Sequence, residues 1–225
     1  MTIQKVTAFI TRERPTGRQL LLFQHPQAGV QLPAGTVDEG EAWETAVLRE
    51  AYEETGLTHL TIHRYLGQIN NELAAGEAIL NQDSHIFSQP DETSLPFAPL
   101  FSRGMTFAVG EQNGRFDNAQ GRRFHHILYT EYDQLPNPTH ITLHIDGWLP
   151  SERLSWRKTR HYVHLLCHEA TPDRWTLPSD RGHVFTPFWA DLQPKPAVVA
   201  PQNRWLDDVY DLLLADGASP GGSSG

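Results

Sequence analysis

Apolar residues at every second position predict a strand near the start of the chain. They alternate with other side chains over about 5–12, the pattern of a strand with two different faces. A turn at 14–17 and a further apolar run at 19–25 complete a predicted hairpin, and 30–32 adds a short strand. We therefore expect extended structure up to about residue 32.

The pattern then changes to that of a helix over 41–55, which has good helix formers and no internal Gly or Pro. Asp38 and Glu41 are spaced like a capping box, and Gly56 stands where a C-cap glycine belongs. The side chains expected to be buried are Ala42, Ala46, Leu48 and Ala51.

A further strand is predicted at 60–69, and Pro and Gly become frequent from about residue 80. Short strand-like runs alternate there with turns, at 84–87, 105–109, 124–132 and 140–145. Closely spaced short strands with turn signals predict a small β-barrel.

After Arg157 the longer elements return. Strands are predicted at 159–169, 175–177 and 183–192. A final helix with Asn203 as its cap has an apolar stripe of Trp205, Leu206, Val209, Leu212 and Leu213. The Gly/Ser-rich end, 217–225, is predicted to be disordered.

Three glutamates of the predicted helix at 41–55 carry its candidate chemistry. Glu50, Glu53 and Glu54 share one helix face beside Arg49, and like-charged carboxylates at such spacing repel. Mg²⁺ is the natural counter-ion, because it binds a few carboxylates together with water and substrate phosphates. The segment therefore predicts a metal site for phosphate chemistry.

The same segment resembles the Nudix box, Gly-x5-Glu-x7-Arg-Glu-U-x-Glu-Glu-x-Gly-U, in which U is aliphatic. Its fixed positions are filled by Gly35, Glu41, Arg49, Glu50, Glu53, Glu54 and Gly56. Leu57 fills the last aliphatic position, and Ala51 fills the other as a small member of that class. A charged surface helix would explain the spacing of the charges but not the two glycines.

This resemblance implies the α+β fold of the Nudix family, an α/β/α sandwich with a mixed sheet between helices. We expect it to occupy 1–79 and 156–216, interrupted by a small all-β, barrel-like insertion at 80–155. The insertion resembles a bacterial Src-homology-3-like barrel. The segments that correspond to the motif of that family are 88–92, 103–104, 109–114 and 147–149. A long irregular insertion is the alternative.

The Nudix resemblance also implies an enzyme, a metal-dependent pyrophosphatase that hydrolyses a nucleoside diphosphate linked to another moiety. Glu50, Glu53 and Glu54 would bind Mg²⁺ or Mn²⁺ with the Gly35 carbonyl, and Arg49 would orient the carboxylates. Glu53 is our choice of general base, although a downstream loop is an alternative source.

In the same family pattern Glu41 would hold the loop against the helix, as a structural residue of the box, as would Gly56. A Nudix-fold module that senses a nucleotide metabolite without cleaving it is the competing hypothesis. The intact box argues against that hypothesis.

Residues outside the box would select the substrate. Trp175, Phe188 and Trp189 are candidates for stacking on a base, although core packing is the commoner role of such rings. Asp180 and Arg181 are candidates for phosphate or ribose contact, with a solvated turn as the alternative.

Charge and composition limit the partners. The 225-residue chain has 18 Lys and Arg against 27 Asp and Glu, a net charge of −9, which disfavours a nucleic-acid polymer. We expect a small nucleotide or organic pyrophosphate as substrate. A homodimer, and a peptide or wall-fragment ligand of the insertion, are left open.

Cys167 is the only cysteine, so no intramolecular disulfide forms, which suits a reducing cytoplasm. A nucleophilic role is the alternative to the expected one, a small buried side chain. The start of the chain has no apolar signal region, and the longest aliphatic stretches, 20–23 and 212–215, are too short for a membrane span. We expect a cytoplasmic protein without a membrane partner.

The 12 histidines suggest no recognised ligand set. His164 and His168 share one face of a predicted strand, and His125 adjoins His126. We expect these residues in a cleft or on the surface rather than in a zinc site.

Overall fold

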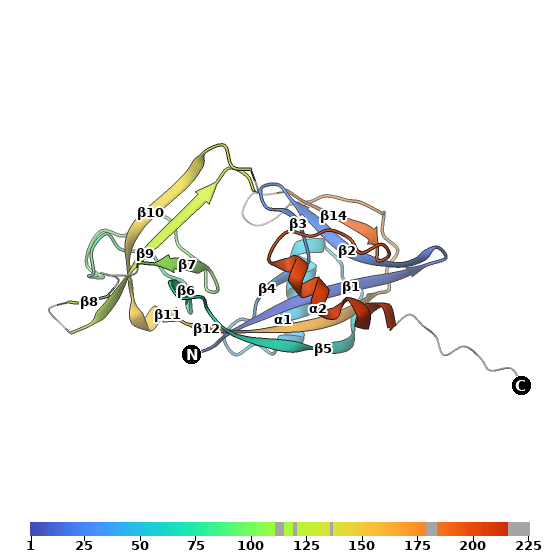
Figure 1. Ribbon diagram of the computed structural model, residues 1–225, viewed down its shortest axis with the longest axis horizontal. Helices are drawn as coiled ribbons and strands as arrows, with labels where there is room; N and C mark the ends of the chain where they lie inside the picture. Colours follow the sequence, from blue (N-terminus) through green and yellow to red (C-terminus); the bar gives the residue numbers. More distant parts are fainter. Residues whose placement is uncertain (111–114, 119–120, 136, 179–183, 216–225) are drawn as a thin grey trace, which may run out of the picture. The chain divides into compact units, whose positions relative to one another are not determined.

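The computed structural model describes residues 1–110, 115–118, 121–135, 137–178 and 184–215 (Figure 1). Its contacts divide the chain into two compact units. We call Val6–Gln68 with His161–Gly225 the box unit, and Met1–Lys5 with Ile69–Arg160 the strand unit. The domain division at 80 and 155 that we expect from the sequence stays a prediction.

The box unit is built on an eight-stranded sheet. The strand order is β13-β14-β2-β1-β12-β5, with β3 beside β2 and β4 beside β1. The strands are β1 (Ile3–Arg14), β2 (Gly17–His25), β3 (Gly29–Gln31), β4 (Ala34–Thr36), β5 (Leu60–Glu72), β12 (Arg157–Cys167), β13 (Leu177–Pro178) and β14 (Val184–Asp191). The predicted hairpin is confirmed, since β1 and β2 pair antiparallel with Thr11 opposite Leu20.

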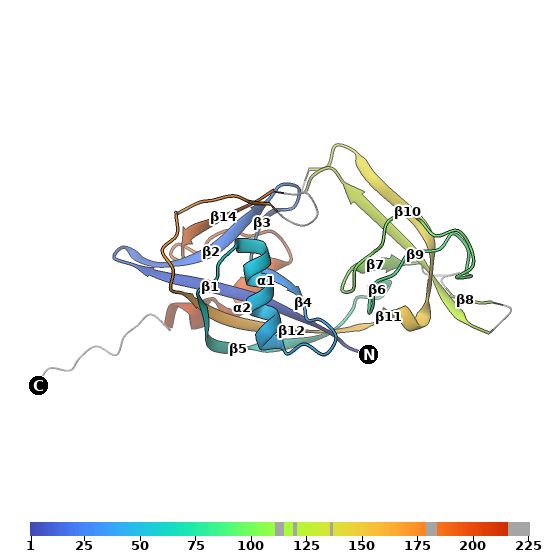
Figure 2. The same ribbon diagram turned by 180° about the vertical axis from the view of Figure 1, so that it is seen from behind.

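One helix covers each face of this sheet, as Figures 1 and 2 show from opposite sides. Helix α1 (Trp43–Thr55) buries Ala46, Val47 and Ala51 against apolar residues of β1 and β12. On the other face the rings of Phe9 and Tyr162 meet edge to face, and α2 (Gln202–Ala215) buries its own apolar stripe. The layers agree with the α+β fold and mixed sheet expected of a Nudix domain.

The start of α1 differs from the prediction. The helix begins at Trp43 with Ala42 as N-cap, and no side chain caps it. The predicted capping box is therefore wrong. Glu41 does accept the Asp38 N–H at 2.9 Å, but this contact closes a turn ahead of the helix.

The buried side of α1 and the start of α2 also differ from the prediction. Val47 of α1 is buried, whereas Ala42, the N-cap, is exposed. Helix α2 begins at Gln202, so Asn203 lies inside it rather than capping it. The Gln202 side chain instead accepts the Leu32 N–H at 2.6 Å.

The other end of α1 follows the prediction. Gly56 has a left-handed backbone, with φ 77°, and its N–H donates to the Tyr52 carbonyl. Such a conformation favours glycine because it has no Cβ. The box glycine thus ends the helix and turns the chain toward β5.

The strand unit has a six-stranded antiparallel sheet in the order β10-β9-β7-β6-β11, with β8 beside β9. Its elements are β6 (Glu77–Leu80), β7 (Thr106–Val109), β8 (Arg115–Asp117), β9 (Arg123–Tyr132), β10 (Ile141–Pro150), a short 3-10 helix (Ser151–Arg153) and β11 (Leu154–Ser155). This order is an open path in the part of the chain that the structure describes, and the predicted barrel is not confirmed.

The strand predicted at 84–87 is wrong. Ser84 and Phe87 form only isolated bridges, to Phe101 and to Pro96 and Trp148. Prolines nearby lack the N–H that a longer ladder needs. The segment therefore meets β10 only at the bridge between Phe87 and Trp148.

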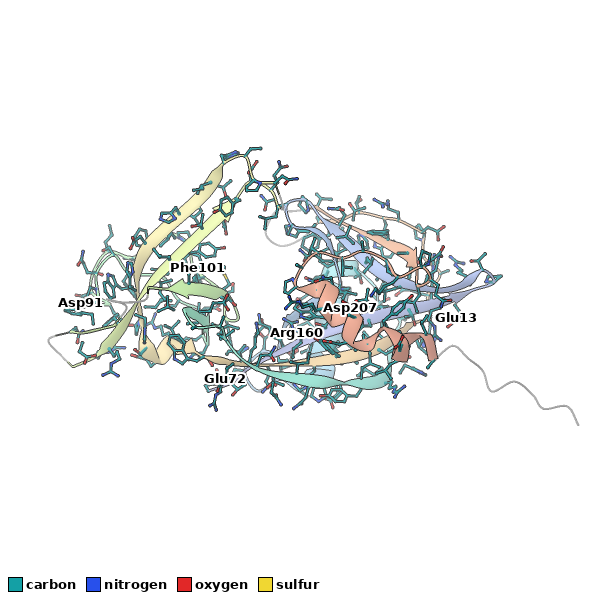
Figure 3. All side chains as sticks on the ribbon, in the orientation of Figure 1. Glu13, Glu72, Asp91, Phe101, Arg160 and Asp207 are labelled. Atoms are coloured by element: carbon teal, nitrogen blue, oxygen red, sulfur yellow. The ribbon has the colours of Figure 1, made fainter. Side chains whose placement is uncertain are left out.

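The strand unit has a hydrophobic core of its own. Phe101, labelled in Figure 3, packs edge to face with Phe107 and with Tyr129. A Cβ on Gly147 would lie 2.7 Å from the Phe87 carbonyl oxygen, so only glycine fits there. This explains the glycine in the motif segment 147–149 without establishing a barrel fold.

Neither helix is long and apolar enough to span a membrane among the residues that the structure describes.

Candidate metal centre

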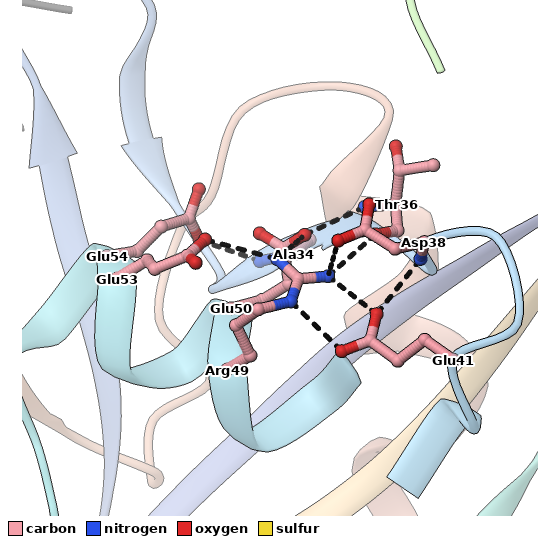
Figure 4. A network of polar contacts seen from close by, with 8 residues as sticks. All are labelled: Ala34, Thr36, Asp38, Glu41, Arg49, Glu50, Glu53 and Glu54. Carbon is pink, nitrogen blue, oxygen red and sulfur yellow. Dashed lines mark hydrogen bonds and ion pairs between the residues drawn. The ribbon is translucent and has the colours of Figure 1, made fainter. Parts of the chain in front are cut away.

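Helix α1 carries the box glutamates to the edge of strand β4 (Figure 4). The Glu54 carboxylate accepts the Ala34 N–H at 2.8 Å, and the Glu50 carboxylate accepts the Thr36 N–H at 3.0 Å. Two backbone N–H groups of one short strand thereby fix two neighbouring carboxylates. The spacing of the glutamates predicted their shared face, but nothing in the sequence pattern indicated these partners on β4.

Arg49 ties the helix, the preceding loop and β4 together. Its guanidinium donates to Glu41 at 3.0 and 2.9 Å, and to the Thr36 carbonyl at 3.0 Å. It also donates to Glu50 at 3.0 Å and to Glu53 at 3.2 Å. A guanidinium suits this task because its donors are fixed in one plane.

The contact of Glu41 with Arg49 explains the place of this acid in the box. Its side chain is only 12% exposed, and the hydrogen bond with Arg49 lowers the pKa of its carboxyl. Glu41 therefore stays ionised and acts on the loop and on Arg49, as the family pattern implies.

Gly35 leaves the space that the Glu50 carboxylate occupies. A Cβ on Gly35 would lie 1.8 Å from Glu50 Cδ and about as close to both carboxylate oxygens. No rearrangement of a few tenths of an ångström relieves such an overlap. The first glycine of the box is thus required by the approach of its glutamate.

Burial makes the charges of this site costly. It raises the pKa of Glu54 well above its ordinary value, and the neighbouring Glu50 and Glu53 carboxylates add to the rise. Burial also raises the pKa of Glu50, although Arg49 opposes it. The Glu53 side chain is 47% exposed.

The donor set fits a hard divalent cation. Glu50 Oε2 and Glu54 Oε1 accept no hydrogen bond from the described residues, so each carboxylate keeps an oxygen available. A cation would also offset the repulsion between buried carboxylates. As the side chains are placed, however, no three acidic, imidazole or thiol groups of the described segments converge on one point. Glu53 would have to turn from Arg49 to join the other two.

The two tryptophans nominated for the substrate make packing contacts. Trp175 is half-buried against the α1 side of the core and donates its indole N–H to the Thr55 carbonyl at 2.8 Å. Trp189 is buried, donates to Thr171 Oγ1 at 2.8 Å and lies under the Arg12 guanidinium at 4.4 Å. These contacts support the packing alternative, and stacking on a base stays a prediction.

The other nominated residues add little to the site. Phe188 is half-buried, with the Arg174 guanidinium 4.7 Å from the centre of its ring. Asp180 and Arg181 lie outside the described residues. Their substrate roles also stay predictions.

Cys167, His164 and His168 have structural surroundings. Cys167 is half-buried, and burial raises the pKa of its thiol, which disfavours a thiolate nucleophile. His164 is fully buried and bonded to Thr11 at 2.7 Å, whereas the residue after β12, His168, is exposed and bonded to Thr61 at 2.7 Å.

Comparison with known families bears on the box directly. Residues 1–95 match the family model of the NUDIX domain. The match includes every box residue and supports the Nudix family for this part of the chain. Nudix proteins are generally hydrolases that act on pyrophosphates, and they generally use divalent metal ions.

The Nudix match ends at residue 95 and therefore gives no support to the Src-homology-3-like resemblance of the later segments. No curated protein matches the chain. A peptide or wall-fragment ligand of the strand unit stays a prediction.

Proposed function

We propose that this protein is a Nudix-type pyrophosphohydrolase that requires Mg²⁺ or Mn²⁺. Its substrate would be a nucleoside diphosphate linked to another moiety, or a related organic pyrophosphate. The observation that carries the proposal is the pair of buried carboxylates, Glu50 and Glu54, fixed by the backbone of β4. A protein seldom retains such a pair without a cation to bind.

Glu50, Glu53 and Glu54 would hold the cation, together with the Gly35 carbonyl. A bound divalent cation neutralises phosphate charge and acidifies water. Ala34 and Thr36 hold two of the carboxylates in place through their N–H groups, so less reorganisation accompanies binding. The acids outnumber the single arginine, and the resulting negative charge favours binding of a cation.

Glu53 is the residue that we propose as general base. Its side chain is more exposed than those of Glu41 and Glu50, which also contact Arg49. A single contact with Arg49, at 3.2 Å, holds it there. An exposed carboxylate can reach a water molecule and release its proton to solvent. Arg49 would act as a positioning residue for Glu53 and Glu50.

Substitution of Glu53 tests this function. With Mg²⁺ and a panel of dinucleotide and sugar-nucleotide pyrophosphates, the native protein should turn over at least one compound into two phosphorylated products. Glu53→Gln keeps the shape of the side chain but removes its charge, and should lower kcat by about 10²-fold or more. Unchanged turnover in a folded Glu53→Gln protein would remove Glu53 from the mechanism.

The competing function is a sensor that binds a nucleotide metabolite without cleaving it. Tight binding of one compound in the panel, with no turnover of any, would favour the sensor over the hydrolase. Since the box retains all its acids, we favour the hydrolase. A cytoplasmic location, suited to a chain with one unpaired cysteine, is part of the same proposal.

A further inference from the structure

A cavity lies in the box unit, where β1 and β12 end. Its volume is about 460 Å³, and it is lined by Thr11–Arg14 and Leu166–Thr171. None of the box residues lines it. Figure 3 labels Glu13, which belongs to this lining, close to the β1–β2 turn.

Two arginines of the lining converge on one carboxylate. Arg12 forms an ion pair with Asp173, and Arg14 Nη2 lies 3.5 Å from the same Asp173 oxygen. Arg12 and Arg14 are two residues apart on a strand, so their side chains leave the same face. Like charges placed together in this way need an anion between them.

The Asp173 side chain is not needed to hold its own segment. The backbone does so, since the Trp189 N–H donates to the Asp173 carbonyl at 3.0 Å and the Trp175 N–H donates to Pro187 at 3.1 Å. The Asp173 side chain is 80% exposed, whereas that of Arg12 is 8% exposed. Because the Asp173 carboxylate is exposed, an anion from solution can reach its position beside the two arginines.

The two carboxylates of the lining, Glu13 and Glu169, have partners of their own. Glu13 pairs with Arg18 at 2.5 Å. Glu169 accepts the N–H groups of Thr58 and His59 at 2.7 and 2.9 Å. Among the described residues, Asp173 is therefore the only carboxylate paired with Arg12 and Arg14.

We propose that this cavity binds a phosphate-bearing small molecule, whose phosphate replaces the Asp173 carboxylate between Arg12 and Arg14. Guanidinium groups recognise phosphate through paired, charge-assisted hydrogen bonds. Thr171 supplies a further hydroxyl, because its Oγ1 lies 3.2 Å from Arg12 Nη1. The remaining volume takes the body of the ligand, beside Leu166 and Ala170.

Removal of the internal competitor tests the site. Binding of inorganic phosphate is measured by calorimetry and by amide chemical shifts, in EDTA so that no divalent ion takes part. Asp173→Asn should bind phosphate more tightly, by up to about fivefold, the range of an exposed ion pair. Arg14→Ala should weaken binding about tenfold, the value of a lost hydrogen bond to a charged group.

Glu13→Gln is the matched control, since it removes one negative charge from the same lining without releasing Arg12 or Arg14. It should change phosphate affinity less than Asp173→Asn does. If both variants changed phosphate affinity equally, the change would reflect only the overall charge near the cavity, and the proposal would be overturned. The proposal would also be overturned if phosphate changed the amide chemical shifts only of residues outside the lining. Unchanged phosphate affinity in Arg14→Ala would overturn it as well.

This proposal is independent of the hydrolase. Glu53→Gln should bind phosphate in EDTA as the native protein does. Arg12 is left unchanged in these experiments because it is buried and stacks on Trp189, so a folding defect is the expected result of its removal.

Discussion

At the scale of single residues, the close contact between Gly35 and Glu50 explains why the box has a glycine at its first position. The glycine is required by what stands beside it rather than by an unusual backbone, since a Cβ would overlap the carboxylate. Arg49 complements this contact by holding Glu50 from the other side at 3.0 Å. The carboxylate therefore has one position, which substitution of either neighbour would change.

Gly35→Ala should displace Glu50 and weaken Mn²⁺ binding by about tenfold or more, as loss of a charged ligand contact does. Calorimetric titration with Mn²⁺ measures this. Gly40→Ala is the control, because a Cβ there meets nothing within 4 Å although its φ of 78° is left-handed. That variant should cost about 1 kcal/mol of stability and leave metal affinity unchanged. Equal metal binding by Gly35→Ala and the native protein would contradict the steric argument.

The pKa values of Glu50 and Glu54 give a further prediction. Burial raises both above the values that the unfolded chain has, so the folded state binds protons more readily. Without metal, the free energy of unfolding should therefore fall as pH rises through the raised pKa values. A divalent cation binds the ionised carboxylates and should reverse this loss.

The increase in melting temperature given by Mg²⁺ should thus be larger at pH 8 than at pH 5.5, measured against EDTA at each pH. Glu54→Gln should remove much of this difference. An increase of the same size at both pH values would show that the buried carboxylates do not bind the ion.

At the scale of elements, helix α1 is held at its C-terminal end by the segment before β14. Trp175 donates to the Thr55 carbonyl, next to Glu54, across 120 positions of sequence. This contact makes Trp175 a positioning residue for the end of the helix that carries Glu53 and Glu54.

Trp175→Phe keeps an aromatic ring but removes the donor, and should destabilise the protein by about 1 kcal/mol. If Trp175 only positions α1, kcat should fall and KM should stay nearly constant. A higher KM at unchanged kcat would instead support the stacking hypothesis. Chemical denaturation and steady-state kinetics on the same preparation separate these results.

The sequence predicted the elements better than their ends. Strands β1, β2, β5 and β14 were expected because their alternation is local, and the Gly56 cap was expected because its backbone needs glycine. The start of α1 was not, because the bond from the Asp38 N–H to Glu41 closes a turn and the helix begins only at Trp43. A spacing motif does not distinguish a turn before a helix from the first turn of the helix.

At the scale of the whole molecule, the box residues and the candidate phosphate cavity all lie in the box unit. The strand unit has its own core, which includes Phe107, Ile127 and Leu149. The Leu73 N–H donates to the Trp156 carbonyl at 2.9 Å, so these two positions lie side by side. A short turn can therefore join them.

Replacement of 74–155 by Asn-Gly should leave a folded protein that retains metal binding and turnover, because two-residue turns of this kind close antiparallel strands. The measurement is kcat/KM for the best substrate in the panel, beside the full chain. A folded, metal-binding deletion protein without turnover would show that the strand unit contributes to the reaction. An altered substrate preference would show that it contributes to selectivity.

The sequence by itself determined the box, the helix that carries it and the alternation of the main strands, because each depends on residues near one another in the chain. The acids, Arg49 and the glycines could be assigned from their spacing. Only the tertiary structure decided that β4 fixes Glu50 and Glu54, that Trp175 holds the end of α1, and that Arg12 meets Asp173 across 161 positions. Contacts of that separation arise when strands pair and layers pack, and no local pattern specifies them.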